Sequence, residues 1–381
     1  MRKVIVLGAG KIGSTIADLL GGSGDYQVVV ADHSQAALQR LDAAAPVTRR
    51  RIDFEAPAEL AALADGAFAV LSAAPYHLTA QIACAAKAAG AHYLDLTEDV
   101  ASTRIVKDLA EGADTAFIPQ CGLAPGFISI AAHDLTTRFD SLLDVKMGVG
   151  ALPQFPSNAL NYNLTWSTDG LINEYCEPCE AIVGGVLRQT QPLEDLEQFA
   201  LDGVVYEAFN TSGGLGTLCE TLEGRVRNLS YRTIRYPGHA AIMKALLNDL
   251  RLRERRGVLK DILENALPAT LQDVVIVYAS VSGERAGRLV QETYAHKIYA
   301  APLQGQLRSA IQITTASAIC AVLDLLVEGA IPQSGFVRQE EVALQAFLQN
   351  RFGRAYAPDA AAHVAAPRTT VDAAITNRAA A

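Results

Sequence analysis

Residues 3–13 read Lys-Val-Ile-Val-Leu-Gly-Ala-Gly-Lys-Ile-Gly, and this stretch decides the fold. Residues 3–7 form a short, largely β-branched run typical of a buried parallel strand, and a G-x-G-x-x-G turn follows at once. The first glycine permits the tight turn, the second lets the backbone approach a pyrophosphate, and the third allows close helix–strand packing. The free amides at the start of the next helix favour an anion. We therefore predict a dinucleotide at Gly8, Gly10, Lys11, Ile12 and Gly13.

The end of the second strand indicates which dinucleotide is bound. Asp32 closes the run 27–31, where a carboxylate can accept hydrogen bonds from both ribose hydroxyls and repels a 2′-phosphate. His33 and Ser34 follow, with no arginine to neutralise such a phosphate. The pattern favours NAD over NADP.

Two further strand ends are candidate cofactor contacts by position. Asp53 closes the third strand and is predicted to border the adenine, although an ordinary strand-end turn explains it equally well. The fourth strand closes on a small-residue segment where a Rossmann sheet passes the ribose nearest the nicotinamide. That segment is Ala73, Ala74 and Pro75.

Short apolar runs alternate with alanine-rich helical stretches through the first third of the chain. This alternation predicts an α/β fold, a Rossmann doubly wound parallel sheet with helices on both faces. The expected strands are 3–7, 27–31, 49–53, 67–73, 92–96 and 115–119, and two expected helices are 12–20 and 79–90.

After about residue 123, polar–apolar alternation predicts an antiparallel sheet with one face covered. The expected strands are 144–152, 180–188, 203–210, 229–236, 273–282 and 288–299, and the expected helices are 238–251, 307–327 and 340–352. The resulting division is a Rossmann domain 1–124, an inserted α+β substrate and dimerisation domain 125–306, helices 307–357 that return to the first domain, and a flexible tail 358–381.

Composition narrows the function classes. The net charge of −9 argues against nucleic acid or an anionic membrane as a partner. We see no signal peptide and expect no membrane span, since the apolar run 319–327 is interrupted by Asp324. The scattered cysteines include one close pair, Cys176 and Cys179, without the second pair or His partners that zinc requires. We expect reduced thiols, no metal and a cytoplasmic protein.

Several segments together resemble the saccharopine dehydrogenase-like family, and within it the lysine 6-dehydrogenases. The segments are 8–13, 92–96 (His-Tyr-Leu-Asp-Leu), 121–126 (Cys-Gly-Leu-Ala-Pro-Gly), 164–167 (Leu-Thr-Trp-Ser), 213–215 and 231–239 (Tyr-Arg-Thr-Ile-Arg-Tyr-Pro-Gly-His). The resemblance spans about residues 1–335 and implies a Rossmann domain with an inserted domain that carries substrate and subunit contacts. Members that act on saccharopine usually carry an acid in place of Ala124, so this chain is expected to take a smaller amine such as lysine.

Oxidising a primary amine requires a group that accepts the ammonium proton before hydride leaves the carbon. His239 begins a helix after a Pro-Gly turn and titrates near neutrality, although a buried structural histidine explains it as well. Asp95 and Glu98 lie at the carboxyl end of the fifth strand, where open α/β sheets bind ligands. Their alternatives are a strand-end cap and a solvated helix-start acid. We predict His239 as the base, ahead of Asp95 and then Glu98.

The α-carboxylate of an amino-acid substrate needs a guanidinium or a nest of amides. Arg235 is the predicted guanidinium, since it lies in the family-like segment beside His239. Thr211 and Ser212 precede two glycines and could form the nest, or merely a glycine turn. Trp166 is expected to wall the pocket, unless it is a plain core aromatic.

Two other readings stay open. A saccharopine- or carboxynorspermidine-type dehydrogenase would need a second cluster of arginines, for which Arg225, Arg227 and Arg232 are available. A non-catalytic NAD sensor would use the fold without chemistry. In every case we expect a small-molecule ligand and a homodimer or larger homo-oligomer, built through the middle domain.

Overall fold

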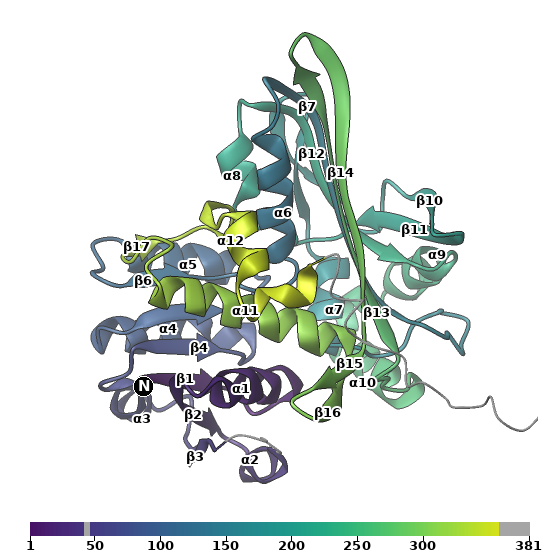
Figure 1. The fold of residues 1–381 in the computed structure, drawn as a ribbon. Helices are drawn as coiled ribbons and strands as arrows, with labels where there is room; N and C mark the ends of the chain where they lie inside the picture. The colour runs from purple at the N-terminus through teal and green to yellow at the C-terminus, as the bar shows by residue number, and fades with distance from the viewer. Residues whose placement is uncertain (42–45, 358–381) are drawn as a thin grey trace, which may run out of the picture.

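The computed structural model describes residues 1–41 and 46–357, which form two large sheets (Figure 1) and a small antiparallel sheet of β15 (Ala301–Leu303) and β16 (Gln306–Arg308). The first is parallel throughout, in the order β17-β6-β5-β4-β1-β2-β3. Its strands are β1 (Arg2–Leu7), β2 (Tyr26–Asp32), β3 (Thr48–Arg51), β4 (Ala69–Ser72), β5 (His92–Asp95), β6 (Ala116–Ile118) and β17 (Gly335–Phe336). The six strands expected from the sequence are confirmed. The seventh was not predicted, because two residues carry no periodicity.

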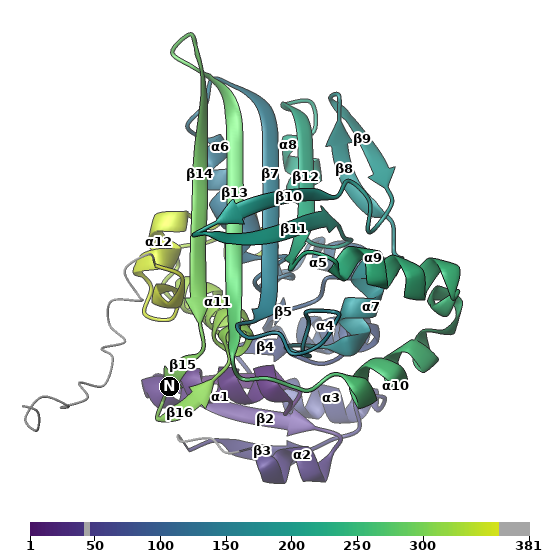
Figure 2. The ribbon, with the colours of Figure 1, turned by 90° about the vertical axis from the view of Figure 1, so that its right-hand side faces the viewer.

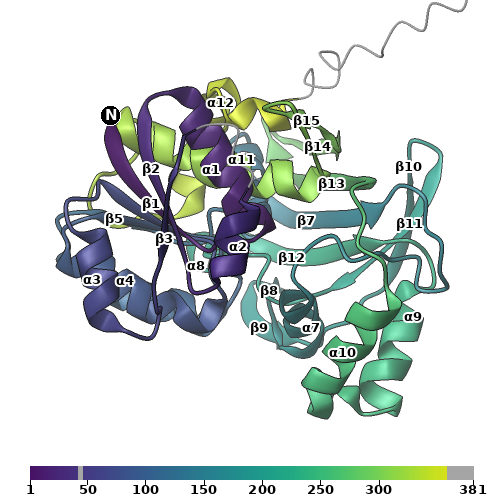
Figure 3. The ribbon, with the colours of Figure 1, turned by 90° about the horizontal axis from the view of Figure 1, so that it is seen from below.

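Helices cover both faces of this sheet, so the doubly wound α/β prediction is confirmed. Successive side chains of β1 point to opposite faces of the sheet and so belong to two separate cores. Val4 and Val6 pack with α1 and α11 on one face, and Ile5 and Leu7 pack with α3 and α4 on the other. Figure 3 shows these layers from below. The helices are α1 (Lys11–Ser23), α2 (Gln35–Arg40), α3 (Pro57–Ala64), α4 (Thr79–Ala88), α5 (Val100–Ala110) and α11 (Ala310–Val327).

The second sheet has eight strands and stands above the first (Figure 2). Its strands are β7 (Ser141–Pro153), β8 (Cys179–Val183), β9 (Val186–Thr190), β10 (Glu197–Leu201), β11 (Val204–Asn210), β12 (Val226–Arg235), β13 (Asp273–Arg285) and β14 (Arg288–Tyr299). The expectation of a purely antiparallel sheet was wrong, because β7 and β12 pair in parallel. The expected single strand 180–188 is a hairpin, since Gly184 and Gly185 turn the chain with positive φ.

The remaining helices lie beside this second sheet. They are α6 (Phe127–Thr136), α7 (Thr168–Cys176), α8 (Leu218–Leu222), α9 (His239–Lys244), α10 (Arg256–Ala266) and α12 (Leu344–Gln349). The expected continuous helix 238–251 is broken, because α9 passes into a π-helical turn (Ala245–Asp249) and Arg251 adopts a left-handed φ of 55°. The expected helix 340–352 is likewise shortened to α12 between two 3₁₀ turns.

The helix α11 joins the two halves of the molecule. Ser309 and Gln312 form a capping box that starts it at Ala310. Contrary to the sequence expectation, α11 is long and apolar enough to span a membrane by length and composition, but 89% of it is buried inside the protein, as in a core helix. It packs on α1, β5 and β13, which returns the chain to the first sheet. The predicted flexible tail, 358–381, lies outside the described residues.

Candidate active site

A cavity of about 960 Å³ lies between the two sheets. Its walls come from the glycine-rich turn, the ends of β4 and β5, α7, β12 and the start of α11. The carboxyl ends of parallel strands at one edge of an open sheet form the usual ligand crevice of this fold. The second sheet closes that crevice from above, so the cavity has a dinucleotide end and a far end deep in the second domain.

The dinucleotide end fits a pyrophosphate. A side chain at Gly13 would meet the Gly8 carbonyl oxygen at 1.8 Å, and one at Gly8, whose φ is +103°, would meet the Ala73 oxygen at 2.7 Å. A side chain at Gly10 would meet nothing within 4 Å, so the backbone there faces open space. Gly10 caps α1 without any side-chain hydrogen bond, which leaves amides free for an anion.

The structure places most predicted cofactor residues around this end. Seven of them line the cavity: Gly10, Lys11, Ile12, Gly13, Ala73, Ala74 and Pro75. Asp32 is buried at the end of β2, where its Oδ2 accepts from the Ala9 amide at 2.7 Å and its Oδ1 from the Ser34 amide at 2.7 Å. The carboxylate thereby ties the glycine-rich turn to the second strand.

Asp53 does not line the cavity. Its Oδ1 accepts from the Glu55 amide at 2.9 Å, so the strand-end turn explains it rather than an adenine contact. Arg51 on β3 pairs in register with Asp32 and donates to the His33 carbonyl at 3.2 Å. An arginine does lie at this corner, although none follows Asp32 directly in the sequence.

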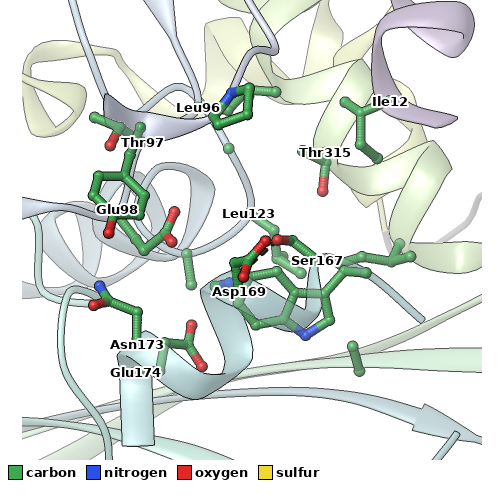
Figure 4. Close-up of a pocket in the computed structure, with 18 of the residues that line it drawn as sticks. Ile12, Leu96, Thr97, Glu98, Leu123, Ser167, Asp169, Asn173, Glu174 and Thr315 are labelled. Carbon is green, nitrogen blue, oxygen red and sulfur yellow. Dashed lines mark hydrogen bonds between the residues drawn. The ribbon is translucent and has the colours of Figure 1, made fainter. Parts of the chain in front are cut away.

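Of the three candidate bases, only Glu98 lines the cavity. Figure 4 shows its side chain beside Thr97, directed into the same space that Glu174 borders from α7. Burial raises the pKa of Glu98 to about 7, and the nearby acids Asp99 and Asp95 add to the rise. A carboxyl group with a pKa near neutrality is suited to accept and return a proton. The ranking that placed Glu98 last is therefore not supported.

Asp95 lies behind the cavity wall and is 1% exposed. Its Oδ1 accepts from the amides of Thr97 at 3.0 Å and Gln120 at 2.9 Å, so it ties the end of β5 to the end of β6. Burial raises its pKa to about 6. These contacts explain Asp95 as a structural acid, but it does not cap the following helix as the alternative reading expected, because Asp99 is the N-cap of α5.

His239 also lies outside the cavity lining, so the structure gives it no access to a substrate amine. It is 1% exposed, its Nδ1 lies 2.8 Å from the Leu160 carbonyl oxygen, and its Nε2 lies 3.0 Å from the Tyr175 hydroxyl. Burial and the Arg235 charge lower its pKa to about 3. Both ring nitrogens are bonded within the protein, so the structure does not support the prediction of His239 as the base.

Arg235 lies where the sequence placed it, at the far end of the cavity. It is 2% exposed, its Nε donates to the Tyr175 hydroxyl at 3.0 Å, and its Nη1 donates to the Ile234 carbonyl at 2.9 Å. Its guanidinium lies 5.1 Å over the Tyr162 ring. It forms no ion pair with any acid in residues 1–41 and 46–357. A buried cation on a cavity wall without such a partner is a ready anion site.

The loop 211–214 does not form the expected carboxylate nest, because none of its residues lines the cavity. The Thr211 hydroxyl bonds that of Thr233 at 2.7 Å, and the Ser212 amide donates to the Glu174 carbonyl at 3.1 Å. A side chain at Gly213, whose φ is +83°, would meet the Glu98 carbonyl oxygen at 2.7 Å. The loop instead supports the backbone of two acids that face the cavity.

Glu174 was not predicted from the sequence. It is 6% exposed, lines the cavity from α7, and has its pKa raised to about 8 by burial and by Glu98, against the opposing effect of Arg235. An acid in the mostly apolar segment Leu-Ile-Asn-Glu-Tyr-Cys (171–176) was the signal that could have found it. Trp166 lines the cavity as predicted, just before α7 and close to Gly170 of that helix.

Two more cations line the cavity wall on α10, and both are already paired. Arg256 donates to Glu177 at 2.6 Å and Lys260 to Asp169 at 2.6 Å. The arginines considered for a second cluster do not line the cavity: they are Arg225, Arg227 and Arg232. Within the described residues no three His, Cys, Asp or Glu side chains gather as a metal site.

The buried acids predict how stability depends on pH. Glu98 and Glu174 keep their protons to higher pH in the folded than in the unfolded chain, so the free energy of unfolding falls as pH rises from about 4.5 to about 8. Glu174→Gln removes one such carboxyl. We expect its melting temperature to equal that of the parent near pH 5 and to exceed it by several degrees at pH 9. Thermal unfolding across this range is the measurement.

The matched control is Glu264→Gln, which neutralises an exposed acid on α10. Its melting curve should follow that of the parent at both pH values. If Glu174→Gln lost as much stability between pH 5 and pH 9 as the parent does, Glu174 would contribute nothing to the pH dependence. Its carboxyl would then already be ionised in the folded protein at pH 5.

Two family models cover most of the chain. Residues 4–116 match the model described as the saccharopine dehydrogenase NADP binding domain, and residues 122–352 match the saccharopine dehydrogenase C-terminal domain. The second match alone spans more than half of the sequence. The boundary between the two falls beside the 121–126 segment at the end of the first sheet.

Of three solved structures, one shares the fold of this chain and two others match it more weakly. The apo saccharopine dehydrogenase (L-Glu forming) of Saccharomyces cerevisiae superposes with a TM-score of 0.75 at 15% identity, over 94% of this chain and 97% of that one. The DAP dehydrogenase of C. glutamicum in complex with DAP matches at 0.47 with 12% identity, over 91% and 95% of the two chains. An engineered D-amino acid dehydrogenase bound to NADP+ matches at 0.46 with 14% identity, over 91% and 95%.

Proposed function

The chain belongs to the saccharopine dehydrogenase family, and from that premise we propose that it oxidises the ε-amine of lysine with NAD and releases ammonia. As a member it is an oxidoreductase with an NAD(P)-binding domain. The choice of lysine rests on one observation, which is the pattern of charges in the cavity. Within the described residues Arg235 forms no salt bridge with an acid and Glu98 and Glu174 form none with a base, although Arg235 and Glu174 are near enough to shift each other's pKa.

Free lysine carries the inverse pattern, with one carboxylate and two ammonium groups. Arg235 would hold the α-carboxylate, and Glu174, whose pKa is influenced by that guanidinium, would hold the α-ammonium. Trp166 would pack along the aliphatic stem. Glu98, which follows β5 at the edge of the first sheet, would meet the ε-amine at the dinucleotide end.

The proposed reaction balances as follows. NAD, when bound, accepts a hydride from the carbon that bears the ε-amine. Glu98 first takes a proton from the ε-ammonium, because a cationic nitrogen cannot support loss of hydride. Glu98 passes that proton to solvent and then accepts a proton from water as the water oxygen adds to the iminium carbon. It returns this proton to the nitrogen of the carbinolamine, and it takes up the hydroxyl proton as ammonia leaves and the aldehyde forms. The product aldehyde, 2-aminoadipate semialdehyde, closes on its own α-amine to piperideine-6-carboxylate.

The test is a screen of amino acids with NAD, followed by absorbance of the reduced cofactor. Lysine should reduce NAD without a second substrate, faster at alkaline pH, with one ammonia per NADH. A requirement for 2-oxoglutarate, or activity on saccharopine alone, would establish the saccharopine-type alternative. That alternative has one supporting observation, since Arg256 and Lys260 could leave their acid partners to hold further carboxylates. Binding of NAD with no oxidised amine would favour a sensor.

The proposed preference for NAD makes a separate prediction. NAD should bind at least tenfold more tightly than NADP, because Asp32 would meet a 2′-phosphate with like charge at close range. Asp32→Ser combined with His33→Arg should narrow or reverse that ratio in a binding titration. Equal affinity of the unmodified protein for both dinucleotides would contradict the proposal and would point to Arg51 as the compensating charge.

A further inference from the structure

A row of buried hydrogen bonds runs away from the cavity behind Arg235. The guanidinium Nε lies 3.0 Å from the Tyr175 hydroxyl, that hydroxyl lies 3.0 Å from His239 Nε2, and His239 Nδ1 lies 2.8 Å from the Leu160 carbonyl oxygen. The three side chains are each at most 2% exposed. None of the steps proposed above uses Tyr175 or His239.

The chemistry of the two ends fixes the direction of every bond in this row. Arg235 can only donate, so the Tyr175 oxygen accepts from Nε and its own proton is free to go to His239. The Leu160 carbonyl can only accept, so Nδ1 carries the ring proton and Nε2 is an acceptor. A neutral imidazole in this one tautomer satisfies both neighbours. The pKa of His239, lowered to about 3, keeps it neutral at any pH at which the protein would work.

We propose that Tyr175 and His239 are positioning residues that hold the Arg235 guanidinium in the orientation that binds the substrate carboxylate. The inference rests on the proposed function, because it assumes that Arg235 receives a carboxylate. The row anchors Nε to the backbone at Leu160, and Nη1 donates to the Ile234 carbonyl, which leaves Nη2 for a carboxylate. Tyr162 supports the same group from the side, 5.1 Å from its ring.

The arginine side chain is long and flexible, so without these contacts its guanidinium could take many positions. An arginine side chain loses substantial rotamer entropy when it is ordered, so a site that orders it in advance binds its ligand more tightly. The alternative is that the row only stabilises the core, where Tyr175 and His239 pack edge-to-face with Phe209 and Tyr162. The two accounts differ in which substrates they affect.

Tyr175→Phe removes both hydrogen bonds of the hydroxyl and keeps the ring, and His239→Gln removes the bridge to Leu160. For each we expect the KM for lysine to rise about tenfold with kcat within about threefold, since a lost ground-state interaction acts in this way. Cadaverine, which is lysine without its carboxylate, should be oxidised by both variants as by the parent. Tyr356→Phe is the control, because it removes a buried hydrogen bond of 2.8 Å to the Thr314 carbonyl and Tyr356 does not line the cavity.

Equal losses with lysine and cadaverine, or no loss with either, would overturn the inference and leave the row a purely structural feature. A melting temperature for each variant, compared with that of Tyr356→Phe, shows how much of any loss reflects unfolding.

A binding experiment separates this inference from the proposed reaction. Trp166 is the single tryptophan and lines the cavity, so its fluorescence reports occupancy without turnover. Norleucine, which has the α-carboxylate but no ε-amine, should bind the parent and bind both variants about tenfold more weakly. If no amine is oxidised, the proposed function fails. The norleucine titration then tests by itself whether Tyr175 and His239 position Arg235. Equal norleucine affinity in parent and variants, or no binding to the parent, would refute the inference even if lysine is a good substrate.

Discussion

Replacing Glu98 by glutamine is expected to lower turnover with lysine by about 10²–10⁴-fold while the dinucleotide still binds. Glutamine keeps the shape of the side chain but cannot accept the ammonium proton. Glu98 is the one candidate base that lines the cavity, and its pKa, raised to about 7 by burial, matches a group that exchanges protons near neutrality. The limb of the pH–rate profile that reports its ionisation should disappear as well. Stopped-flow or steady-state absorbance of the reduced cofactor measures both effects.

Glu174→Gln is the matched comparison, because it makes the same change in the other cavity acid. If Glu174 holds the α-ammonium, its loss should raise the KM for lysine and leave kcat within about tenfold. A collapse of turnover in Glu174→Gln with little change in Glu98→Gln would exchange the two roles. Small effects in both variants would show that the base is neither acid.

The second large effect is expected from Arg235→Met, which keeps most of the buried stem and removes the charge. We expect kcat/KM for lysine to fall by about 10²–10³, because a charge-assisted contact in a desolvated site is lost. Affinity for NAD should not change, since Arg235 lies at the opposite end of the cavity. Arg235→Lys should recover little, because an ammonium cannot reproduce the planar fork.

The same substitution should also act on Glu174. Arg235 lowers the pKa of Glu174, so removing the guanidinium should raise that pKa further and move the pH dependence of binding to higher pH. An unchanged kcat/KM for lysine in Arg235→Met would exclude the carboxylate role. The α10 cations, Arg256 and Lys260, would then be the candidates to test next.

Local patterns accounted for the first sheet and its cofactor end. The glycine-rich turn needs its three glycines within six residues. The contact that forbids a side chain at Gly13 comes from the turn itself, and the contact at Gly8 comes from Ala73 after β4, the neighbouring strand in the sheet. The parallel pairing of β7 with β12 could not be read in this way. It joins strands about 80 residues apart, and polar–apolar alternation looks the same in a parallel and an antiparallel pair when one face is covered.

At the far end of the site some residues could be predicted and others could not, again because the contacts there join distant parts of the chain. Arg235 and His239 were found because they share one short segment, but their side chains bond to Tyr175 on α7, which lies 60 and 64 residues earlier in the chain. In the sequence His239 has the local setting of a catalytic histidine. In the structure, however, Tyr175 and Leu160 form hydrogen bonds with both of its ring nitrogens. Glu174 stands in a segment without a motif, so its place on the cavity wall follows only from the packing of α7 against β12.

The position of α11 in the chain has a consequence for how the protein is made. On the ribosome, the strands of the first sheet emerge early, yet one of their apolar faces is completed by a helix that begins at Ala310. The strand β17, which adds the edge beside β6, comes later still. For the time needed to synthesise roughly two hundred further residues, Val4, Val6 and their neighbours must remain accessible or be shielded by a chaperone. A nascent chain halted before Ala310 therefore presents an open hydrophobic face, and completion of the nucleotide-binding half is one of the last events of synthesis.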